Sequence, residues 1–214
     1  MLNLGNVVFS MYTGIIAGKF KVKKIVDTEG LRSFIVELNK DLIYGLSLGA
    51  SVSVNGVCFT VTKVEGLNVG FDAMQETLDK TTISDIKEED FLNIERSAKI
   101  GDEIGGHTMS GHVSTMANII NIKTSQNNKV MTFKVDNDWM KYIFSKGFIG
   151  LDGASLTVVN AQKEDGLFDI HFIPETLRNT CFGDKQVGDR VNLEIDPSTQ
   201  TIVDTVERYL ENKI

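Results

Sequence analysis

The sequence predicts an all-β fold in which two tandem six-stranded antiparallel barrels, Greek-key-like and related by an internal duplication, are followed by a C-terminal α-helix. Polar and apolar residues alternate over many short stretches, which is the period of a strand with one buried face. A series of residues recurs in order 97 positions further along the chain. After the second copy, the apolar residues change to spacings of three and four, which is typical of one face of a helix.

The duplication is the most informative of these observations, because self-similarity at a fixed period indicates repeated structural units. Residues 52–61 read VSVNGVCFTV and residues 149–158 read IGLDGASLTV. Other matches at 97 or 99 positions are Thr13-Gly14-Ile15-Ile16 with Ser110-Gly111-His112-Val113, Glu76-Thr77-Leu78 with Glu175-Thr176-Leu177, and Asp90, Asn93 and Glu95 with Asp189, Asn192 and Glu194. The repeat indicates either two copies of one functional site or a duplicated structural domain without a shared function.

Alternation within each copy predicts the strands. Residues 58–62 (CFTVT) alternate polar and apolar side chains, and residues 155–158 (SLTV) repeat the arrangement. Gly, Asn and Asp turns separate the other expected strands, which lie at 20–26, 33–38, 67–73, 91–95, 130–135 and 167–173. About six strands in each half suit a closed antiparallel barrel, which leaves no exposed sheet edge.

The expected organisation is an N-terminal extension at 1–10, a first barrel at 11–97, a second barrel at 98–197 and a C-terminal helix at 198–214. A short helix is expected at 138–144. Pro197 and Ser198 suit the start of the C-terminal helix. Its apolar face must be buried, either against a barrel or against other copies of the chain.

Composition excludes several classes of protein. The chain has 214 residues, of which 42% are hydrophobic and 24% charged, as is typical of a globular protein. The net charge of −7 argues against general nucleic-acid binding, which needs positive charge to displace phosphate counterions. No apolar run is long enough to span a membrane, and residues 1–10 make a poor signal peptide. Two cysteines, Cys58 and Cys181, do not suggest a disulfide framework, so the predicted location is the cytosol.

Common catalytic motifs do not occur in the sequence. No carboxylate lies at a metal-ligand spacing from His107 or His112, so no metal site is predicted. The glycines near these histidines form neither G-x-G-x-x-G nor a G-x-x-x-x-G-K phosphate loop. Cys58 taken alone fits a small buried hydrophobe better than a nucleophile.

The repeat makes a duplicated ligand pocket plausible. Cys58 and Thr60 share one face of their strand, and Ser155 and Thr157 share the equivalent face in the second copy. Two copies of one pocket suit a protein that handles two molecules of the same ligand. The copies differ at three matched pairs, which are Ile15 and His112, Gly49 and Lys146, and Asp72 and His171.

Taken together, these motifs resemble the riboflavin synthase alpha chain, of the lumazine-binding barrel family. The resemblance runs from Met11 to about Arg208 and includes Met11-Tyr12-Thr13-Gly14-Ile15, Asn55-Gly56-Val57-Cys58-Phe59-Thr60-Val61-Thr62, Gly105-Gly106-His107 through Ser110-Gly111-His112, Lys146-Gly147, Asp152-Gly153-Ala154-Ser155-Leu156-Thr157-Val158 and Ile173-Pro174-Glu175-Thr176-Leu177. Family members usually begin at the methionine equivalent to Met11 and have Phe where this chain has Tyr12.

The resemblance implies that each barrel binds one 6,7-dimethyl-8-ribityllumazine and that the protein is a homotrimer assembled with the help of the tail helix. It implies a dismutation, the last step of riboflavin biosynthesis, in which one lumazine gives a four-carbon unit to another. The products are riboflavin and 5-amino-6-(D-ribitylamino)uracil. No flavin, nicotinamide or metal cofactor is implied, because the lumazine ring is its own electron sink.

The substrate-binding positions that the resemblance implies fall into matching stretches of the two halves: Gly14, Ile15, Ile16, Cys58, Phe59, Thr60, Asp72, Ala73, Met74, Gln75, Glu76, Thr77, Gly111, His112, Val113, Lys146, Ser155, Leu156, Thr157, Ile173, Pro174, Glu175, Thr176, Leu177 and Arg178.

For the chemistry, His112 is the predicted base or proton shuttle, with Ser155 and Thr157 orienting the ring beside it. Cys58 and Thr60 are expected to orient the ring in the other barrel, and Lys146 is the next candidate for proton transfer. The main alternative is a non-catalytic lumazine- or flavin-binding antenna protein of the same fold. A flavin-binding barrel of a reductase is a weaker alternative, because the chain has no room for a nucleotide-binding domain.

Overall fold

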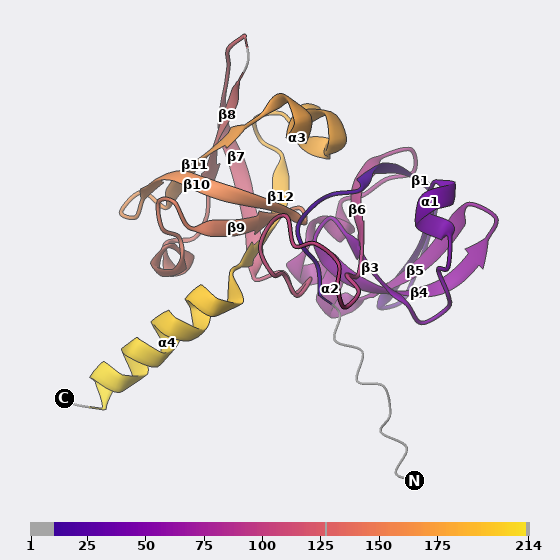
Figure 1. Ribbon diagram of the computed structural model, residues 1–214, viewed down its shortest axis with the longest axis horizontal. Coiled ribbons are helices and arrows are strands. Elements are labelled where there is room, and N and C mark those ends of the chain that lie inside the picture. Colours follow the sequence, from indigo (N-terminus) through magenta and orange to yellow (C-terminus); the bar gives the residue numbers. More distant parts are fainter. Residues whose placement is uncertain (1–10, 127, 213–214) are drawn as a thin grey trace.

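The computed structural model describes residues 11–126 and 128–212. The expected N-terminal extension at 1–10 lies outside the described residues. The described chain forms two closed barrels side by side, with a helix projecting from the second (Figure 1).

Each barrel has six antiparallel strands, as the sequence predicts. The first has the strand order β1-β2-β5-β4-β3-β6 and the second has β10-β11-β8-β7-β12-β9, which is the same circular order when matched strands are compared. The strands of the first are β1 (Gly18–Thr28), β2 (Leu31–Glu37), β3 (Ser51–Val54), β4 (Val57–Glu65), β5 (Asn68–Met74) and β6 (Phe91–Arg96). Those of the second are β7 (Thr115–Thr124), β8 (Lys129–Lys134), β9 (Phe148–Leu151), β10 (Ala154–Gln162), β11 (Leu167–Phe172) and β12 (Arg190–Ile195).

Alternating side chains fill the two barrels with separate hydrophobic cores. In the first, Phe34, Phe59 and Phe71 pack together with ring centroids 5.2 to 6.0 Å apart. In the second, Phe133 and Phe168 stack at 5.3 Å. Each half therefore has its own core, so the predicted ligand pockets can lie only on outward faces or between the halves.

The two barrels meet at their matching β-turns. Asn55-Gly56 and Asp152-Gly153 each have positive φ at both residues, which is the geometry of the two-residue hairpin turn that Asn-Gly and Asp-Gly favour. A Cβ added to Gly56 would lie 2.7 Å from the backbone nitrogen of Gly153, so the turns are in backbone contact. Glycine is needed at the second position of each turn, because the positive φ and the close approach both disfavour a side chain there.

A reciprocal pair of hydrogen bonds locks this junction. The side-chain amide of Asn93 donates to the Asp152 carbonyl oxygen at 2.9 Å, and that of Asn192 donates to the Asn55 carbonyl oxygen at 2.8 Å. Since Asn93 and Asn192 are matched residues of the repeat, the bonds relate the barrels by an approximate two-fold axis.

The shorter helical elements connect strands. They are α1 (Lys40–Ile43), α2 (Gln75–Lys80), the 3₁₀ helices η1 (Thr82–Ser84), η2 (Asn137–Tyr142) and η3 (Cys181–Gly183), and α3 (Pro174–Asn179). The helix expected at 138–144 is η2, a 3₁₀ helix that begins at Asn137 and ends at Tyr142. The matched helices α2 and α3 follow β5 and β11, as the repeated Glu-Thr-Leu segments suggest.

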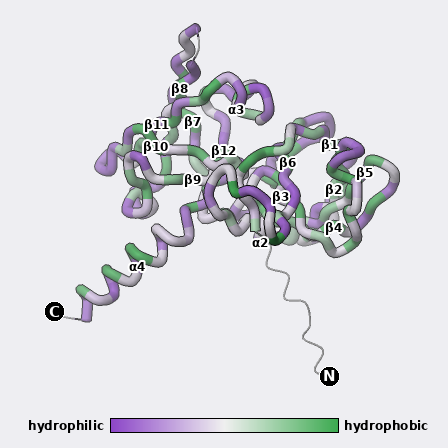
Figure 2. The backbone as a smooth tube through the Cα atoms, in the orientation of Figure 1, coloured by the Kyte–Doolittle hydropathy of each residue, from purple (hydrophilic) through white to green (hydrophobic). Residues whose placement is uncertain are grey.

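The C-terminal helix is α4 (Pro197–Glu211), capped by the Asp196 side chain. It is tied to the second barrel over its first three turns, where Val203 packs on the core, Tyr142 donates a hydrogen bond to Asp204 at 2.5 Å and Lys141 pairs with Glu207. Beyond that it projects from the body (Figure 1), and hydrophobic positions recur along it (Figure 2). Four apolar side chains of α4 are exposed, namely Ile202, Val206, Tyr209 and Leu210.

None of the helices in the described part of the chain is long and apolar enough to cross a membrane. Cys58 and Cys181 are not joined in a disulfide. The cytosolic location stays a prediction.

Candidate active site

The two predicted polar pairs lie at equivalent places on matching strands. Thr60 on β4 and Thr157 on β10 are exposed, and Cys58 and Ser155 are partly exposed. The residues between and beside them are buried in the barrel cores. Each pair thus shares an outward face, as the alternation predicts.

Matching strand ends and helices lie next to these pairs. β4 pairs with β5, which leads into α2, and β10 pairs with β11, which leads into α3. On the first barrel the predicted residues here are Asp72, Ala73, Met74, Gln75, Glu76 and Thr77; on the second they are Ile173, Pro174, Glu175, Thr176, Leu177 and Arg178. Phe59, Ala73 and Leu156 point into the cores, so their side chains do not face the predicted pockets.

The segment that contains His112 lies on the first barrel, not on its own. The Gly111 carbonyl oxygen accepts a hydrogen bond from the Cys58 backbone N–H at 2.9 Å. A Cβ on Gly111 would lie 2.6 Å from the Cys58 Cβ, and Val113 packs against the first core. The predicted grouping of His112 with Ser155 and Thr157 is therefore wrong, because the segment before β7 crosses to the other barrel.

The equivalent segment of the first half crosses the opposite way. The Gly14 carbonyl oxygen accepts from the Ser155 backbone N–H at 2.9 Å, and a Cβ on Gly14 would lie 2.4 Å from the Ser155 Cβ. Ile16 is part of the second core, and Ile15 beside it is exposed. We call residues 14–16 and 111–113 the crossing segments.

The structure thus assembles two candidate sites. The first site consists of Cys58 and Thr60, residues 72–77, and the crossing segment 111–113. The second site consists of Ser155 and Thr157, residues 173–178, Lys146, and the crossing segment 14–16. Lys146 belongs here because its backbone N–H donates to the Val158 carbonyl oxygen at 2.7 Å, next to Thr157.

The two sites have the same backbone arrangement but differ in the charge of their side chains. Exposed His112 is at the first site, where Asp72 accepts a hydrogen bond from Ser33 at 2.6 Å. The second site has exposed Lys146, held at φ 70°, and exposed His171 at the position that matches Asp72. The two proton-transfer candidates therefore lie at different sites.

Two aromatic rings for which the sequence motifs predict no role contact the polar pairs. The buried Tyr12 hydroxyl donates to Cys58 Sγ at 3.0 Å, and burial holds the Tyr12 pKa far above its usual range. His107 Nδ1 lies 2.6 Å from Ser155 Oγ, and its ring stacks on Phe148 at 5.2 Å. Burial lowers the His107 pKa, which favours the neutral ring.

Two buried carboxylates were also not assigned, although the repeat had paired them. Glu95 on β6 accepts hydrogen bonds from Thr13 and Gly14, and Glu194 on β12 accepts equivalent bonds from Ser110 and Gly111. Desolvation raises the pKa of both carboxyl groups, against the effect of these bonds. The sequence signal for them is the recurrence of an acidic residue at matched positions of two predicted strands.

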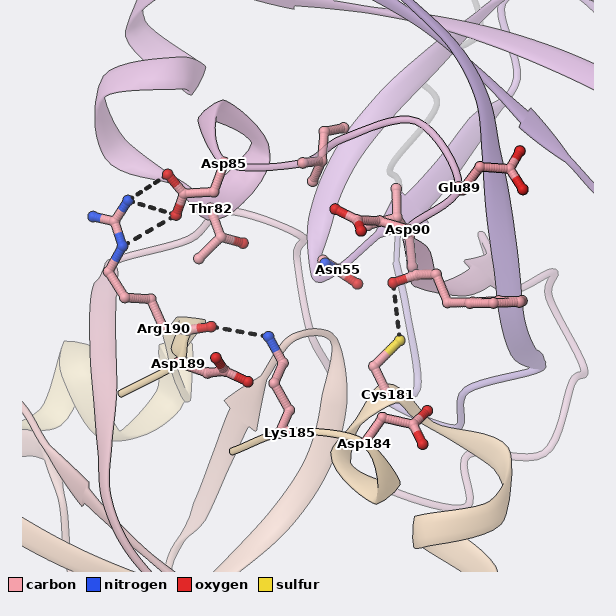
Figure 3. A pocket seen from close by; sticks show the side chains of 13 residues that line it. Asn55, Thr82, Asp85, Glu89, Asp90, Cys181, Asp184, Lys185, Asp189 and Arg190 are labelled. Atoms are coloured by element: carbon pink, nitrogen blue, oxygen red, sulfur yellow. Dashed lines mark hydrogen bonds and ion pairs between the residues drawn. The ribbon is translucent and has the colours of Figure 1, made fainter. Parts of the chain in front are cut away.

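A groove between the barrels, with a volume of about 450 Å³, contains none of the predicted site residues. Figure 3 shows that Arg190 binds Asp85 across it, and the Cys181 thiol donates to the Phe91 carbonyl oxygen at 3.2 Å. Burial raises the pKa of Cys181 to about 12, so this thiol stays protonated. These contacts join the two halves. Within the described residues, no three His, Cys, Asp or Glu side chains cluster as metal ligands.

Sequence comparison gives the same two units. A family model described as the Lumazine binding domain matches residues 13–97 and 110–196. The chain is 51% identical over 201 residues to the riboflavin synthase of Escherichia coli (strain K12), covering 94% of this chain and 93% of that protein. It is 42% identical over 205 residues to the riboflavin synthase of Buchnera aphidicola subsp. Schizaphis graminum, covering 95% and 98%.

Solved structures of LumP share the fold. LumP complexed with riboflavin superposes with a TM-score of 0.81 at 24% identity, covering 86% of this chain and 99% of that chain. LumP complexed with 6,7-dimethyl-8-(1'-D-ribityl) lumazine gives a TM-score of 0.77 at 23% identity, covering 86% and 98%.

Proposed function

Because the chain belongs to the riboflavin synthase family of lumazine-binding transferases, we propose that it converts two molecules of 6,7-dimethyl-8-ribityllumazine into riboflavin and 5-amino-6-(D-ribitylamino)uracil. The observation that carries the proposal is the presence of two equivalent sites on one chain. A dismutation of two identical molecules needs two places of the same shape, and the two equivalent candidate sites fit that need.

The reaction is balanced without an oxidant or reductant. The donor lumazine gives up a four-carbon unit, with its two ring carbons and two methyl groups, and leaves as the diaminouracil. The acceptor gains that unit and becomes riboflavin. Loss of a proton from the 7-methyl group gives a carbanion that the electron-poor ring stabilises, so each substrate supplies its own electron sink.

Alignment of the two rings is then the main task of the protein. Well-oriented reactants reach effective molarities of about 10⁵–10⁸ M, which corresponds to roughly 7–11 kcal/mol of the barrier. A positioned acid or base adds about 10²–10⁴-fold. In the proposed mechanism Cys58, Thr60, Ser155 and Thr157 orient the rings, and His112 moves the proton at the first site.

The two sites of one chain do not face each other. The helices α2 and α3, one beside each site, lie on opposite sides of the junction between the barrels (Figure 1). Two lumazines bound to one chain would therefore stay apart. In the proposed assembly, a homotrimer in which other copies cover the apolar face of α4, the first site of one subunit faces the second site of a neighbour.

An assay with lumazine alone tests the proposed activity. The purified protein, incubated with 6,7-dimethyl-8-ribityllumazine and no other cofactor, should form one riboflavin for every two lumazines consumed. A metal chelator should not change the rate. The alternative function, non-catalytic binding, is favoured by the fold likeness to LumP; it predicts a tight complex and no riboflavin.

Mixed trimers test where the active site lies. Thr60→Trp should block the first site and Thr157→Trp the second, and each variant alone should be inactive. After the two variants are unfolded together and refolded, about a quarter of the wild-type activity should return. In a randomly mixed trimer, about one interface in four joins an intact first site to an intact second site. Confirmed mixed trimers without activity would contradict the inter-subunit site.

A further inference from the structure

The buried carboxylates Glu95 and Glu194 hold the two crossing segments with the same set of hydrogen bonds. Glu95 Oε1 accepts from the backbone and the hydroxyl of Thr13 at 2.7 and 2.8 Å, and Oε2 accepts from the Gly14 N–H at 3.0 Å. Glu194 repeats this with Ser110 at 2.6 and 2.8 Å and with Gly111 at 3.1 Å. Both carboxylates are at least 95% buried.

Three donors around two oxygens require a carboxylate. An ionised carboxyl group is an acceptor at both oxygens and can satisfy all three donors. A glutamine side chain would place its NH₂ group against a backbone N–H or a hydroxyl, leaving at least one buried donor without an acceptor. The arrangement is thus specific to Glu.

We call each carboxylate with its three donors a clamp. The hydroxyl group of Thr13 or Ser110 extends each clamp by one residue along the chain. Ser110 Oγ, which donates to Glu194, accepts the backbone N–H of His112 at 3.2 Å. Thr13 Oγ1, which donates to Glu95, accepts the backbone N–H of Ile15 at 3.3 Å. Each carboxylate therefore fixes the main chain up to the residue that differs most between the two sites.

Each clamp acts on the site of the opposite barrel. Glu194 belongs to the second barrel, but the Gly111 that it holds is bonded to Cys58 of the first site. Glu95 belongs to the first barrel, but the Gly14 that it holds is bonded to Ser155 of the second site.

We propose that Glu95 and Glu194 are positioning residues for the reaction, each of which sets one wall of the lumazine site on the barrel opposite its own. The proposal rests on the proposed function for the identity of the ligand. The geometric part of the proposal is that a change in one barrel weakens the site on the other. That part can be tested without measuring turnover.

The test measures each site separately in the full chain. In a Thr157→Trp background only the first site can bind lumazine, and in a Thr60→Trp background only the second can. In the first background, Glu194→Gln should weaken lumazine binding roughly 10-fold, the effect of a buried donor left without an acceptor. Glu95→Gln should change it less than about two-fold. In the Thr60→Trp background, Glu95→Gln should weaken binding roughly 10-fold and Glu194→Gln should change it less than about two-fold.

Controls separate positioning from loss of charge or fold. Glu164→Gln removes an exposed carboxylate and should change neither site. If a Glu→Gln variant does not fold, Ser110→Ala and Thr13→Val each remove the hydroxyl that links the carboxylate to the crossing segment. Both should give the same crossed pattern, with effects of about two- to five-fold.

A measurement without ligand checks the same geometry. Amide hydrogen exchange should become faster at Cys58 in the Ser110→Ala and Glu194→Gln variants and at Ser155 in the Thr13→Val and Glu95→Gln variants. The proposal is overturned if each variant weakens the site on its own barrel, or both sites equally. Crossed binding defects without riboflavin formation would contradict the proposed function and leave the positioning role intact.

Discussion

The first and second sites have the same backbone and different chemistry. Both have a polar pair on a strand, a short helix beside it and a crossing segment held by a buried carboxylate. The first site has His112 where the second has Ile15, and the second has Lys146 where the first has Gly49. Under the proposed function, the duplicated scaffold fixes where two identical molecules bind, and the few unmatched side chains give them different roles.

The largest effect is expected at His112 and Ile15, the matched pair whose side chains differ most in chemistry. His112→Ala should lower turnover by about 10²–10⁴-fold, the contribution of a positioned acid or base. Lumazine binding should change far less, because the contacts of Cys58 and Thr60 remain. The matched variant Ile15→Ala should act on binding at the second site and leave the chemical step nearly unchanged. Steady-state kinetics with lumazine, together with binding titrations, measure both.

Near-normal turnover of His112→Ala would remove the imidazole from the mechanism. Lys146→Ala would then be the next variant to measure, and a large loss there would move the proton transfer to the second site.

A second prediction concerns the equivalence of the crossing segments. Gly111→Ala and Gly14→Ala should each lower the free energy of unfolding by more than about 3 kcal/mol, since strain at positive φ adds to a clash with the opposite barrel. Their Cβ atoms would lie 2.6 and 2.4 Å from the nearest side-chain carbon. Chemical denaturation measures the loss.

Gly30 provides the control for this prediction. It has φ 70° and open space around its missing Cβ, so Gly30→Ala should cost only about 1 kcal/mol from the backbone conformation. A loss at Gly111 or Gly14 no larger than at Gly30 would show that the crossing segments are loosely packed.

The smallest expected effect is on the pH dependence of stability. Burial raises the native pKa of Glu95 and Glu194 above the ordinary value of 4.5, so the native state holds protons that the unfolded chain has released. The stability contribution is complete below pH 4.5 and is lost as the pH rises through the native pKa, with a slope of at most about 1.4 kcal/mol per pH unit for each group.

Glu95→Gln and Glu194→Gln should each remove part of this slope, and by similar amounts if the clamps are equivalent. Unfolding free energies measured at pH values from about 4 to about 8 report the difference. A change in only one variant would show that the two clamps differ in their surroundings.

Much of the fold could be predicted from sequence, because its signals are local. Alternation fixed the outward face of Cys58 and Thr60, and Asn55-Gly56 has the residue types of a tight hairpin turn. The matched series of residues showed that the second half repeats the first. In the structure each of these patterns has the expected geometry.

The assembly of each site could not be predicted in the same way. Nothing in the residues around His112 shows that they leave their own barrel, since the crossing depends on how the halves pack through Gly56 and Gly153. The repeat also displayed Glu95 and Glu194 as a matched pair. Their role appeared only when the buried partners of both carboxylates were known.

The crossing segments give the two sites different histories during synthesis. Residues 14–16 emerge from the ribosome before every strand of the barrel they serve, whereas residues 111–113 emerge after β6 has ended at Arg96. The first barrel can therefore close while one wall of its site is missing. That wall is anchored only when Glu194, close to the end of the chain, has been made. The barrel that is translated first thus has a site that is finished only with β12, the last strand of the second barrel.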